Sequence, residues 1–373
     1  MGSGGYLIGV DTGGTYTDAA VIESEGHRVL ASAKSITTKG DLAIGVVGAI
    51  TAAVEGLPQG LRPGDVSLVS VSTTLATNAV VEGHGSSVGA LLIGFDKAMA
   101  ERTGIARGFP AMPVALIGGG HDHNGDEAMP LDLEAVRRAA AAMEVDAFAI
   151  ASAFAVRNPA HERAARDMVH EMTGKPVTLP TELTSALDAP RRALTAVLNA
   201  RLIARISTLI EAVRRAMARL GLSCPLMIVK GDGSLALAER VALRPIETVL
   251  SGPAASLVGA AWLSGRADFI MSDIGGTTTD LGILRAGRPK VSEEGAEVGG
   301  WRTMVRAIDV KTVGLGGDSE IAIGVDGRLS VGPQRVAPVA LLAARYPETV
   351  AMLEADLADS DGGSLHDKFV LRP

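Results

Sequence analysis

The chain has 373 residues, of which 47% are hydrophobic and 3% aromatic, and its formal net charge is −7. This length is too great for one ordinary core and suits two domains with a cleft between them. The acidic net charge argues against nucleic acid and anionic membranes as partners. The single cysteine, Cys224, excludes a disulfide framework and a cysteine-rich zinc site, and it favours a reducing cytoplasm.

The first predicted elements are two strands joined by a glycine turn. Residues 6–10 form an apolar run rich in β-forming residues, residues 11–18 read DTGGTYTD, and residues 19–22 are apolar again. Because paired glycines mark tight turns, this segment predicts strand, turn, strand.

Strand and helix patterns alternate after this hairpin. They predict helices over residues 43–54, 133–143 and 161–173, and strands over residues 66–71, 88–93 and 147–156. Such alternation is typical of an α/β fold with a largely parallel sheet covered by helices. No apolar stretch of about 20 residues is free of charge, so no membrane span is predicted.

The clearest helix is predicted over residues 188–220. Asp188 is placed to cap it, Pro190 opens its first turn and Gly221 ends it, and apolar residues recur at spacings of three and four. Seven arginines lie on the opposite side, namely Arg191, Arg192, Arg201, Arg205, Arg214, Arg215 and Arg219. An anion site is one interpretation, but a solvated outer face is favoured because arginine stems commonly cover helix surfaces.

The glycine turn returns in the second half of the chain. A strand is predicted over residues 226–229, and a helix of small residues opens at 249–256. An apolar run then leads into residues 273–280, DIGGTTTD, which match residues 11–18 at six of eight positions. A third glycine turn follows at residues 312–319, and the pattern fades from Gly332 onward.

The repeated turn suits phosphate binding with a divalent metal. Paired glycines let backbone N–H groups converge on an anion, and threonine hydroxyls add donors. The leading carboxylates, Asp11 and Asp273, would repel bare phosphate unless a hydrated Mg²⁺ lay between. Either turn alone could simply close a hairpin, but a repeat with a carboxylate at both ends favours two turns that hold one nucleotide.

Two rival motifs are weaker. Residues 85–89 (GSSVG) fit the nucleophile elbow of serine hydrolases, but a strand is predicted where that motif needs a helix. A divalent-metal site could use His121, Asp122, His123, Asp126 and Glu127. Asn124-Gly125 within this stretch favours a polar hairpin tip instead.

Several motifs, taken in order, resemble the hydantoinase/oxoprolinase family. They are residues 11–18, 72–79 (STTLATNA), 158–162 (NPAHE), 244–255 (RPIETVLSGPAA), 273–280 and 313–319 (VGLGGDS). The resemblance implies an α/β protein with two ribonuclease-H-like (actin-like ATPase) domains and a nucleotide cleft between them. We therefore expect an N-terminal domain over residues 6–185, a second domain over 186–332 and a C-terminal extension over 333–373.

The resemblance also implies roles for individual residues. Asp11 and Asp273 would be the catalytic and Mg²⁺-holding carboxylates, and Thr74 and Asn78 would face the reacting group. The implied ATP-binding residues are Thr12, Gly13, Gly14, Thr15, Thr17, Gly275, Gly276, Thr277, Thr278, Gly316, Gly317 and Asp318. Asp18 and Asp280 have two interpretations, either a share in the metal site or support of their own hairpins through backbone N–H groups.

The implied function is ATP-dependent hydrolysis of a cyclic amide such as a hydantoin or 5-oxoproline, whose amide oxygen is phosphorylated to drive ring opening. The alternatives are an ATP-dependent kinase or ligase, and a nucleotide-binding regulator without its own substrate. A second hydrolase subunit, an oligomer and a cytoplasmic location are also expected. The sequence departs from the family at residues 230–233 (KGDG), where Asn-Gly-Gly is usual, and at Asp318, where glycine is usual; full-length members are also far longer.

Overall fold

The computed structural model describes residues 5–13, 16–25, 28–38, 41–276, 278–324, 326–337 and 339–358. The chain divides into two compact units. Unit 1 comprises Met1–Gly259 and Pro289–Asp309, and unit 2 comprises Ala260–Arg288 and Val310–Pro373. The domain division after residue 185 stays a prediction.

The first sheet of unit 1 has six strands in the order β10-β9-β4-β1-β2-β3. Their bounds are β1 Tyr6–Thr12, β2 Tyr16–Glu23, β3 Val29–Ile36, β4 Val66–Thr73, β9 Leu226–Val229 and β10 Leu235–Leu237. Strands β1, β4 and β9 are parallel, and β2, β3 and β10 pair antiparallel with their neighbours. The sheet is therefore mixed, which corrects the prediction of a largely parallel sheet for this part of the chain.

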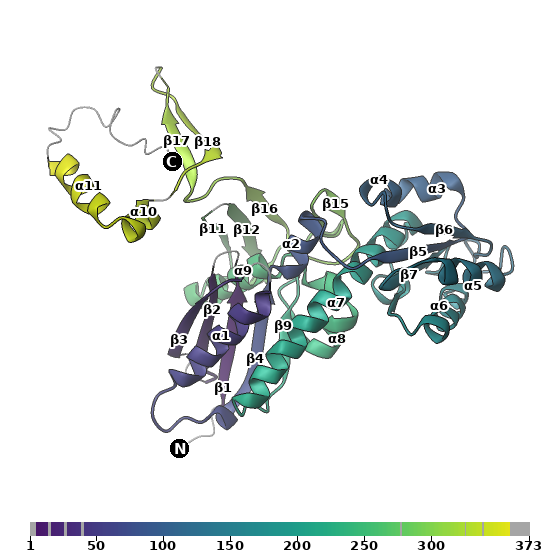
Figure 1. The fold of residues 1–373 in the computed structure, drawn as a ribbon, viewed down its shortest axis with the longest axis horizontal. Coiled ribbons are helices and arrows are strands. Elements are labelled where there is room, and N and C mark those ends of the chain that lie inside the picture. Colours follow the sequence, from purple (N-terminus) through teal and green to yellow (C-terminus); the bar gives the residue numbers. More distant parts are fainter. Residues whose placement is uncertain are drawn as a thin grey trace. The chain divides into compact units, whose positions relative to one another are not determined.

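Two helices cover one face of this sheet, α1 (Leu42–Glu55) and α7 (Ala189–Arg219) (Figure 1). Alternate strand residues such as Ile8, Val10 and Val71 pack against apolar side chains of both helices. The other face carries Gly9, Asp11 and the residues beside them, and it remains open to a ligand.

The second sheet of unit 1 is wholly parallel, with the order β6-β5-β7-β8. Its strands are β5 Val88–Ile93, β6 Val114–Ile117, β7 Ala147–Ser152 and β8 Val177–Thr178. Helices α5 (Leu133–Ala142) and α6 (Ala160–Thr173) pack on one face, and the first half of α7 packs on the other. The strand predicted over residues 147–156 ends at Ser152, because the chain turns at Phe154, whose φ is 53°.

Helix α7 follows its sequence signals closely. Asp188 accepts a hydrogen bond from the backbone N–H of Arg191, and the helix ends at Arg219, two residues before Gly221. By length and composition it is the one helix among the described residues that could cross a membrane, but 67% of its most apolar window is buried inside the protein. A core helix that joins two sheets accounts for this composition.

The predicted outer face of arginines on α7 is only partly correct. Arg205, Arg214, Arg215 and Arg219 are exposed, whereas Arg192 is buried and donates to the carbonyls of Thr184 and Ala186. The sequence could not show this because the first half of α7 is enclosed on all sides. Arginines there satisfy backbone carbonyls and do not face solvent.

Shorter elements complete unit 1. The helices are α2 Leu75–Val81, α3 Lys97–Arg102, α4 Ile105–Gly108, α8 Ala238–Leu243 and α9 Ser251–Ser264, the last of which continues into unit 2. Strands β14 (Glu297–Val298) and β15 (Trp301–Arg302) form a small hairpin.

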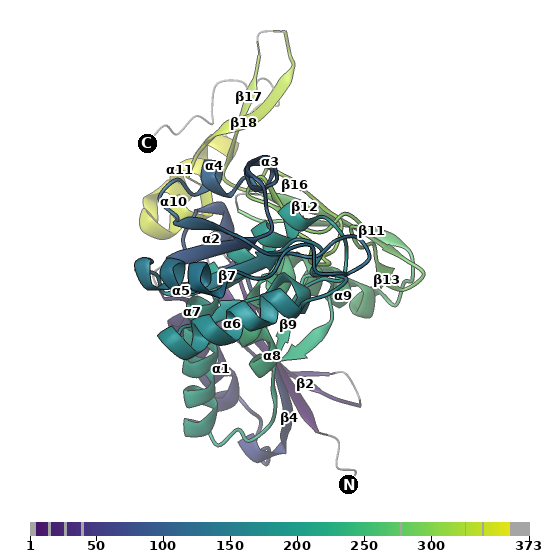
Figure 2. The same ribbon diagram turned by 90° about the vertical axis from the view of Figure 1, so that its right-hand side faces the viewer.

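Unit 2 is built around a second antiparallel hairpin. Strand β11 (Phe269–Ile274) pairs with β12 (Thr279–Arg285), which also neighbours β13 (Arg288–Pro289) and β16 (Val310–Val313). Strands β17 (Ser319–Ile323) and β18 (Leu329–Arg335) form a separate ribbon (Figure 2). Helices α10 (Val339–Arg345) and α11 (Glu348–Ala358) follow, so regular structure continues beyond Gly332, where the sequence pattern fades.

Candidate functional site

The first glycine turn closes the hairpin of β1 and β2. Asp11 pairs with Asp18 and Thr12 with Thr17 across the hairpin, and the N–H of Gly13 donates to the carbonyl of Tyr16 over 2.9 Å. A Cβ on Gly13 would lie 3.0 Å from that carbonyl oxygen, so the tight turn favours glycine. Gly14 and Thr15, which were also expected to bind phosphate, lie outside the described residues.

The second glycine turn has the same geometry. Asp273 pairs with Asp280, and the N–H of Gly275 donates to the carbonyl of Thr278 over 2.9 Å. Asp273 is exposed, as Asp11 is. Thr277 lies outside the described residues. The sequence repeat is therefore also a structural repeat of strand pairing, register and turn closure.

The third glycine turn lies directly against the second. The N–H of Gly317 donates to the carbonyl of Gly275 over 3.0 Å, and the N–H of Asp318 donates to the carbonyl of Gly276 over 2.8 Å. The carboxylate of Asp318 forms an ion pair with Arg335 at 3.3 Å. Unit 2 thus brings together two groups of predicted nucleotide-binding residues that lie about forty positions apart in sequence.

The last carboxylate of each repeat is held by the neighbouring strand. Asp18 pairs with Lys34 of β3, with 2.6 Å between Oδ1 and Nζ. Asp280 pairs with Thr312 of β16, whose hydroxyl donates to Oδ1 over 2.6 Å. The partners are side chains of a third strand, whereas the sequence had suggested only a metal or backbone N–H groups.

A cavity of about 600 Å³ lies on the open face of the first sheet. The residues that line it come from β1, β2, β3, β4, β9 and α9, and they are Gly9, Val10, Asp11, Asp18, Ala19, Ala20, Ser32, Ala33, Lys34, Ser70, Ser72, Val229 and Ala255. Asp11 accepts a hydrogen bond from the Ser72 hydroxyl of the adjacent strand. The described lining therefore combines carboxylates, hydroxyls and the ammonium group of Lys34, carried largely by strands of the first sheet.

Thr12 and Thr17 lie on the opposite, buried side of the first hairpin. Strand alternation places them beside the core, where the Thr17 and Thr37 hydroxyls are 3.0 Å apart. The Thr12 hydroxyl is buried and has no hydrogen-bond partner among the described residues. Because these two side chains face the core, Thr12 and Thr17 could contact phosphate only through their backbone groups.

Thr74 and Asn78 are placed together at the end of β4. Thr74 is the residue before α2, and the Asn78 amide donates to its hydroxyl over 3.3 Å. Ser251, at the start of α9, donates to the carbonyl of Thr73 over 2.9 Å. Ser72 of the same strand contacts Asp11. Thr74 and Asn78, the pair predicted to face the substrate, therefore lie at the same end of the strands as the first turn.

Lys34 was not predicted from the sequence, and Ser72 was noted only as the first residue of the motif at 72–79. Both line the cavity, and Lys34 is the only lysine or arginine among the described residues that line it. Each lies directly across from a predicted carboxylate, Lys34 from Asp18 and Ser72 from Asp11, and this strand register is known only from the structure.

The stretch from His121 to Glu127 forms a hairpin tip. His121 and Glu127 make an antiparallel bridge, and Asp122 accepts backbone hydrogen bonds from Asn124, Gly125 and Asp126. In the part of the chain that the structure describes, no group of three or more His, Cys, Asp or Glu side chains could hold a metal ion. The polar-hairpin interpretation is confirmed.

The motif at residues 158–162 leads into α6 and makes hydrogen bonds with this hairpin tip. His161 accepts a hydrogen bond from the N–H of Gly120 at Nδ1, so its proton lies on Nε2, 2.9 Å from Glu127. Asn158 donates to the carbonyl of Gly125, and buried Glu162 accepts from the N–H of Ser152. These contacts give the motif a structural role.

Acid should destabilise this region through His121. Burial and the neighbouring His161 lower the pKa of His121, although Glu127 and Asp122 partly oppose them. The unfolded state then takes up the proton first, so stability should fall as the pH drops below about 6.5. Thermal midpoints between pH 7.5 and 5 should fall less in His121→Gln than in the wild type. His123→Asn, at an exposed position, should keep the wild-type slope; equal slopes in all three proteins would contradict this assignment.

Sequence comparison identifies the family. The pattern described as "Hydantoinase/oxoprolinase N-terminal region" matches residues 7–173, and that of "Hydantoinase/oxoprolinase" matches residues 192–346. Caprolactamase subunit alpha of Pseudomonas jessenii is 29% identical over 351 residues, which are 88% of this chain and 50% of that protein. 5-Oxoprolinase 1 of Arabidopsis thaliana is 30% identical over 183 residues, 48% of this chain and 14% of that protein.

Structure comparison agrees. The crystal structure of the ATP-dependent caprolactamase from Pseudomonas jessenii matches with a TM-score of 0.73 and 29% identity over 88% of this chain and 51% of that chain. Nucleotide-free acetone carboxylase matches with a TM-score of 0.72 at 20% identity over the same shares, which shows a shared fold. The chain spans about half the length of caprolactamase subunit alpha, the first of these relatives.

Proposed function

Because the chain belongs to the hydantoinase/oxoprolinase family, we propose that it binds ATP and uses it to activate a cyclic amide for ring opening. The observation that carries the proposal is the repeated hairpin, whose glycine turn and terminal carboxylates recur in unit 1 and unit 2 with the same register. The cavity beside the first copy provides room and polar groups for a ligand.

The residues of both turns fit a nucleotide phosphate and a hydrated magnesium ion. A Cβ on Gly13 would lie 3.0 Å from the carbonyl oxygen of Tyr16, so this position favours glycine, and a residue without a side chain would let an anion approach the backbone closely. Asp11 and Asp273 would hold Mg²⁺, which usually keeps several waters and binds few protein carboxylates. This coordination also agrees with the lack of a three-residue metal cluster among the described residues. The ion would neutralise charge on the phosphates.

We also propose that the two hairpins belong to two ribonuclease-H-like domains that contact one nucleotide. In each unit the hairpin continues antiparallel into a third strand, β3 beside β2 and β16 beside β12. The third turn, joined to the second by backbone hydrogen bonds, would contact the adenosine.

The proposed reaction has two steps. The amide oxygen attacks the γ-phosphorus of ATP, and the bond to the leaving oxygen of ADP breaks. In the second step one water attacks the amide carbon and the ring C–N bond breaks to leave an acyl phosphate, which a second water hydrolyses to a carboxylate and phosphate. The cyclic amide, ATP and the two waters thus give the ring-opened amino acid (N-carbamoylated where the substrate is a hydantoin), ADP and phosphate. In this scheme Thr74 and Asn78 would orient the amide, and the glycine turns would fix the phosphates.

A partner polypeptide is part of the proposal. One relative is named a subunit, and this chain spans half of its length. Among the described residues, no group of three or more His, Cys, Asp or Glu side chains could hold a metal ion that activates water. We propose that a second hydrolase subunit supplies that step and that the assembly is an oligomer.

The test is ADP release across hydantoin, 5-oxoproline and simple lactams, with and without the product of a neighbouring gene. We expect slow basal ATP hydrolysis by the chain alone, and ADP release coupled to ring opening once the partner is present. A stable phosphorylated product would favour a kinase or ligase. Basal hydrolysis unchanged by every cyclic amide, with the partner present, would favour a regulator and contradict the proposal.

A further inference from the structure

The two hairpins differ at one informative position. Across from the last carboxylate of the repeat, the third strand carries Lys34 in unit 1 and Thr312 in unit 2. Turn closure and strand register are otherwise the same. The first hairpin therefore has a cation where the second has a hydroxyl.

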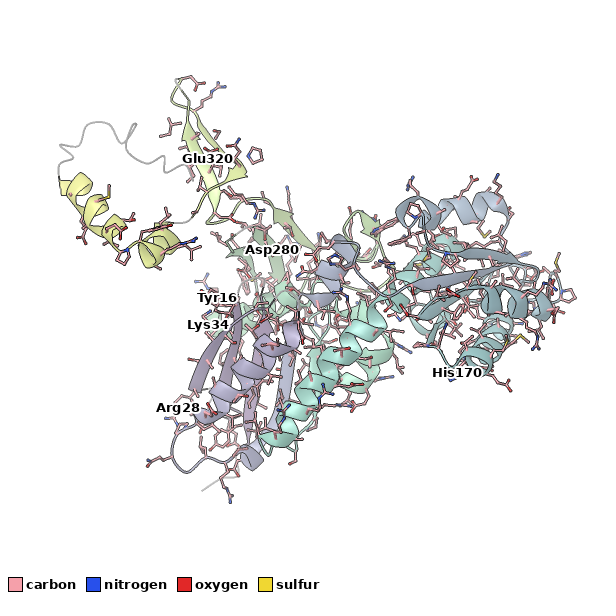
Figure 3. All side chains as sticks on the ribbon, in the orientation of Figure 1. Tyr16, Arg28, Lys34, His170, Asp280 and Glu320 are labelled. Atoms are coloured by element: carbon pink, nitrogen blue, oxygen red, sulfur yellow. The ribbon has the colours of Figure 1, made fainter. Side chains whose placement is uncertain are left out.

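Lys34 is held beside the first turn by two contacts. Its Nζ lies 2.6 Å from Asp18 Oδ1 and 4.9 Å from the centre of the Tyr16 ring, whose backbone carbonyl closes the turn with Gly13. Figure 3 labels Lys34 and Tyr16 at neighbouring positions. The ammonium group is thus positioned between the turn and the cavity.

Neither contact explains the lysine as a stabilising residue. The Lys34 and Asp18 side chains are 57% and 53% exposed, and an ion pair so exposed contributes little to stability. A lysine ammonium has three donors, and Asp18 uses one of them. Lys34 lines a cavity that Asp11 and Asp18 also line, so a phosphate bound there would have the Lys34 ammonium group beside the two carboxylates.

We propose that Lys34 binds the β- or γ-phosphate of the nucleotide and that Asp18 positions it. This inference rests on the proposed function, since it assumes that the ligand of the cavity is ATP. A phosphate would then contact a charged side chain on the strand beside the first hairpin. On the strand beside the second hairpin, the residue at the same position is Thr312, which offers a hydroxyl. It also gives Asp18 a positioning role in place of metal binding.

The experiment compares Lys34→Met with Lys290→Met. Lys290 forms an ion pair with Asp309 at the same distance of 2.6 Å and with similar exposure, 55% and 47%, but it does not line the cavity. Calorimetry with Mg²⁺ would measure the binding of ATP, ADP and AMP to each variant. We expect Lys34→Met to weaken ATP binding by at least about tenfold and AMP binding far less, because AMP lacks the contacted phosphates. Lys34→Arg should restore part of the affinity, and thermal midpoints should stay at the wild-type value.

Two results would overturn the inference separately from the proposed function. Wild-type ATP affinity in Lys34→Met would show that the lysine does not contact phosphate. An equal loss for ATP, ADP and AMP, or an equal loss in Lys290→Met, would show a general effect of removing a surface charge. Failure of the wild type to bind any of these nucleotides would overturn the proposed function, and the inference with it.

Discussion

We expect Asp11→Asn and Asp273→Asn each to lower ATP turnover by about 10- to 100-fold, the usual cost of losing a side chain that holds a metal through its waters. The change keeps the shape of the side chain and removes its charge, so a hydrated Mg²⁺ would lose an anchor. Both carboxylates are exposed at strand ends, so the fold should not depend on them. ADP release and calorimetric Mg-ATP binding measure the effect.

A matched control is Asp268→Asn, at the far end of the second hairpin, where the carboxylate accepts a hydrogen bond from the N–H of Ala286. This variant should keep wild-type turnover. Loss of turnover in only one of the two repeat variants would show that a single turn holds the metal. Wild-type affinity in both would exclude the repeated carboxylates from nucleotide binding.

We expect Gly231→Ala to destabilise unit 1 by about 3 kcal/mol, in the upper range for overpacking. A Cβ at this buried position would lie 2.0 Å from the carbonyl oxygen of Val249. The backbone cannot easily move away, because Gly231 donates to the carbonyl of Glu247 and accepts from the N–H of Ile308, both over 2.7 Å. Denaturant unfolding measures the loss.

Gly259→Ala is the control of opposite sign. This glycine lies within α9, and a Cβ there would meet no atom within 4 Å. Replacement by alanine should therefore stabilise the helix by about 0.5–1 kcal/mol.

If Gly231→Ala were as stable as the wild type, the close packing of residues 230–233 against residues 245–249 would be incorrect. Because Val249 leads into α9, the same variant should also disturb the hydrogen bond between Ser251 and Thr73.

The sequence alone determined the repeated turn and many of the local elements, although it did not predict β3 or the helices beyond Gly332. Apolar runs on both sides of a glycine pair can form little else than a hairpin, and the structure confirms this for residues 6–22 and 269–284. The cap at Asp188 and the stop at Gly221 likewise placed α7 correctly. These features depend on residues within a few positions of one another, so local sequence is sufficient to predict them.

Only the tertiary structure decided what surrounds the turns. Ser72 lies beside Asp11, Lys34 beside Asp18 and Gly317 beside Gly275 because strands and loops distant in sequence meet in one particular register. A shift of one residue would turn each side chain to the opposite face of its sheet, and the local sequence does not specify that register. Burial of Arg192 depends in the same way on the segments that enclose α7. The cavity and the position of Lys34 beside it thus follow from the pairing of strands that are distant in sequence. The energy of that pairing is spread over the whole sheet and is not encoded in a single motif.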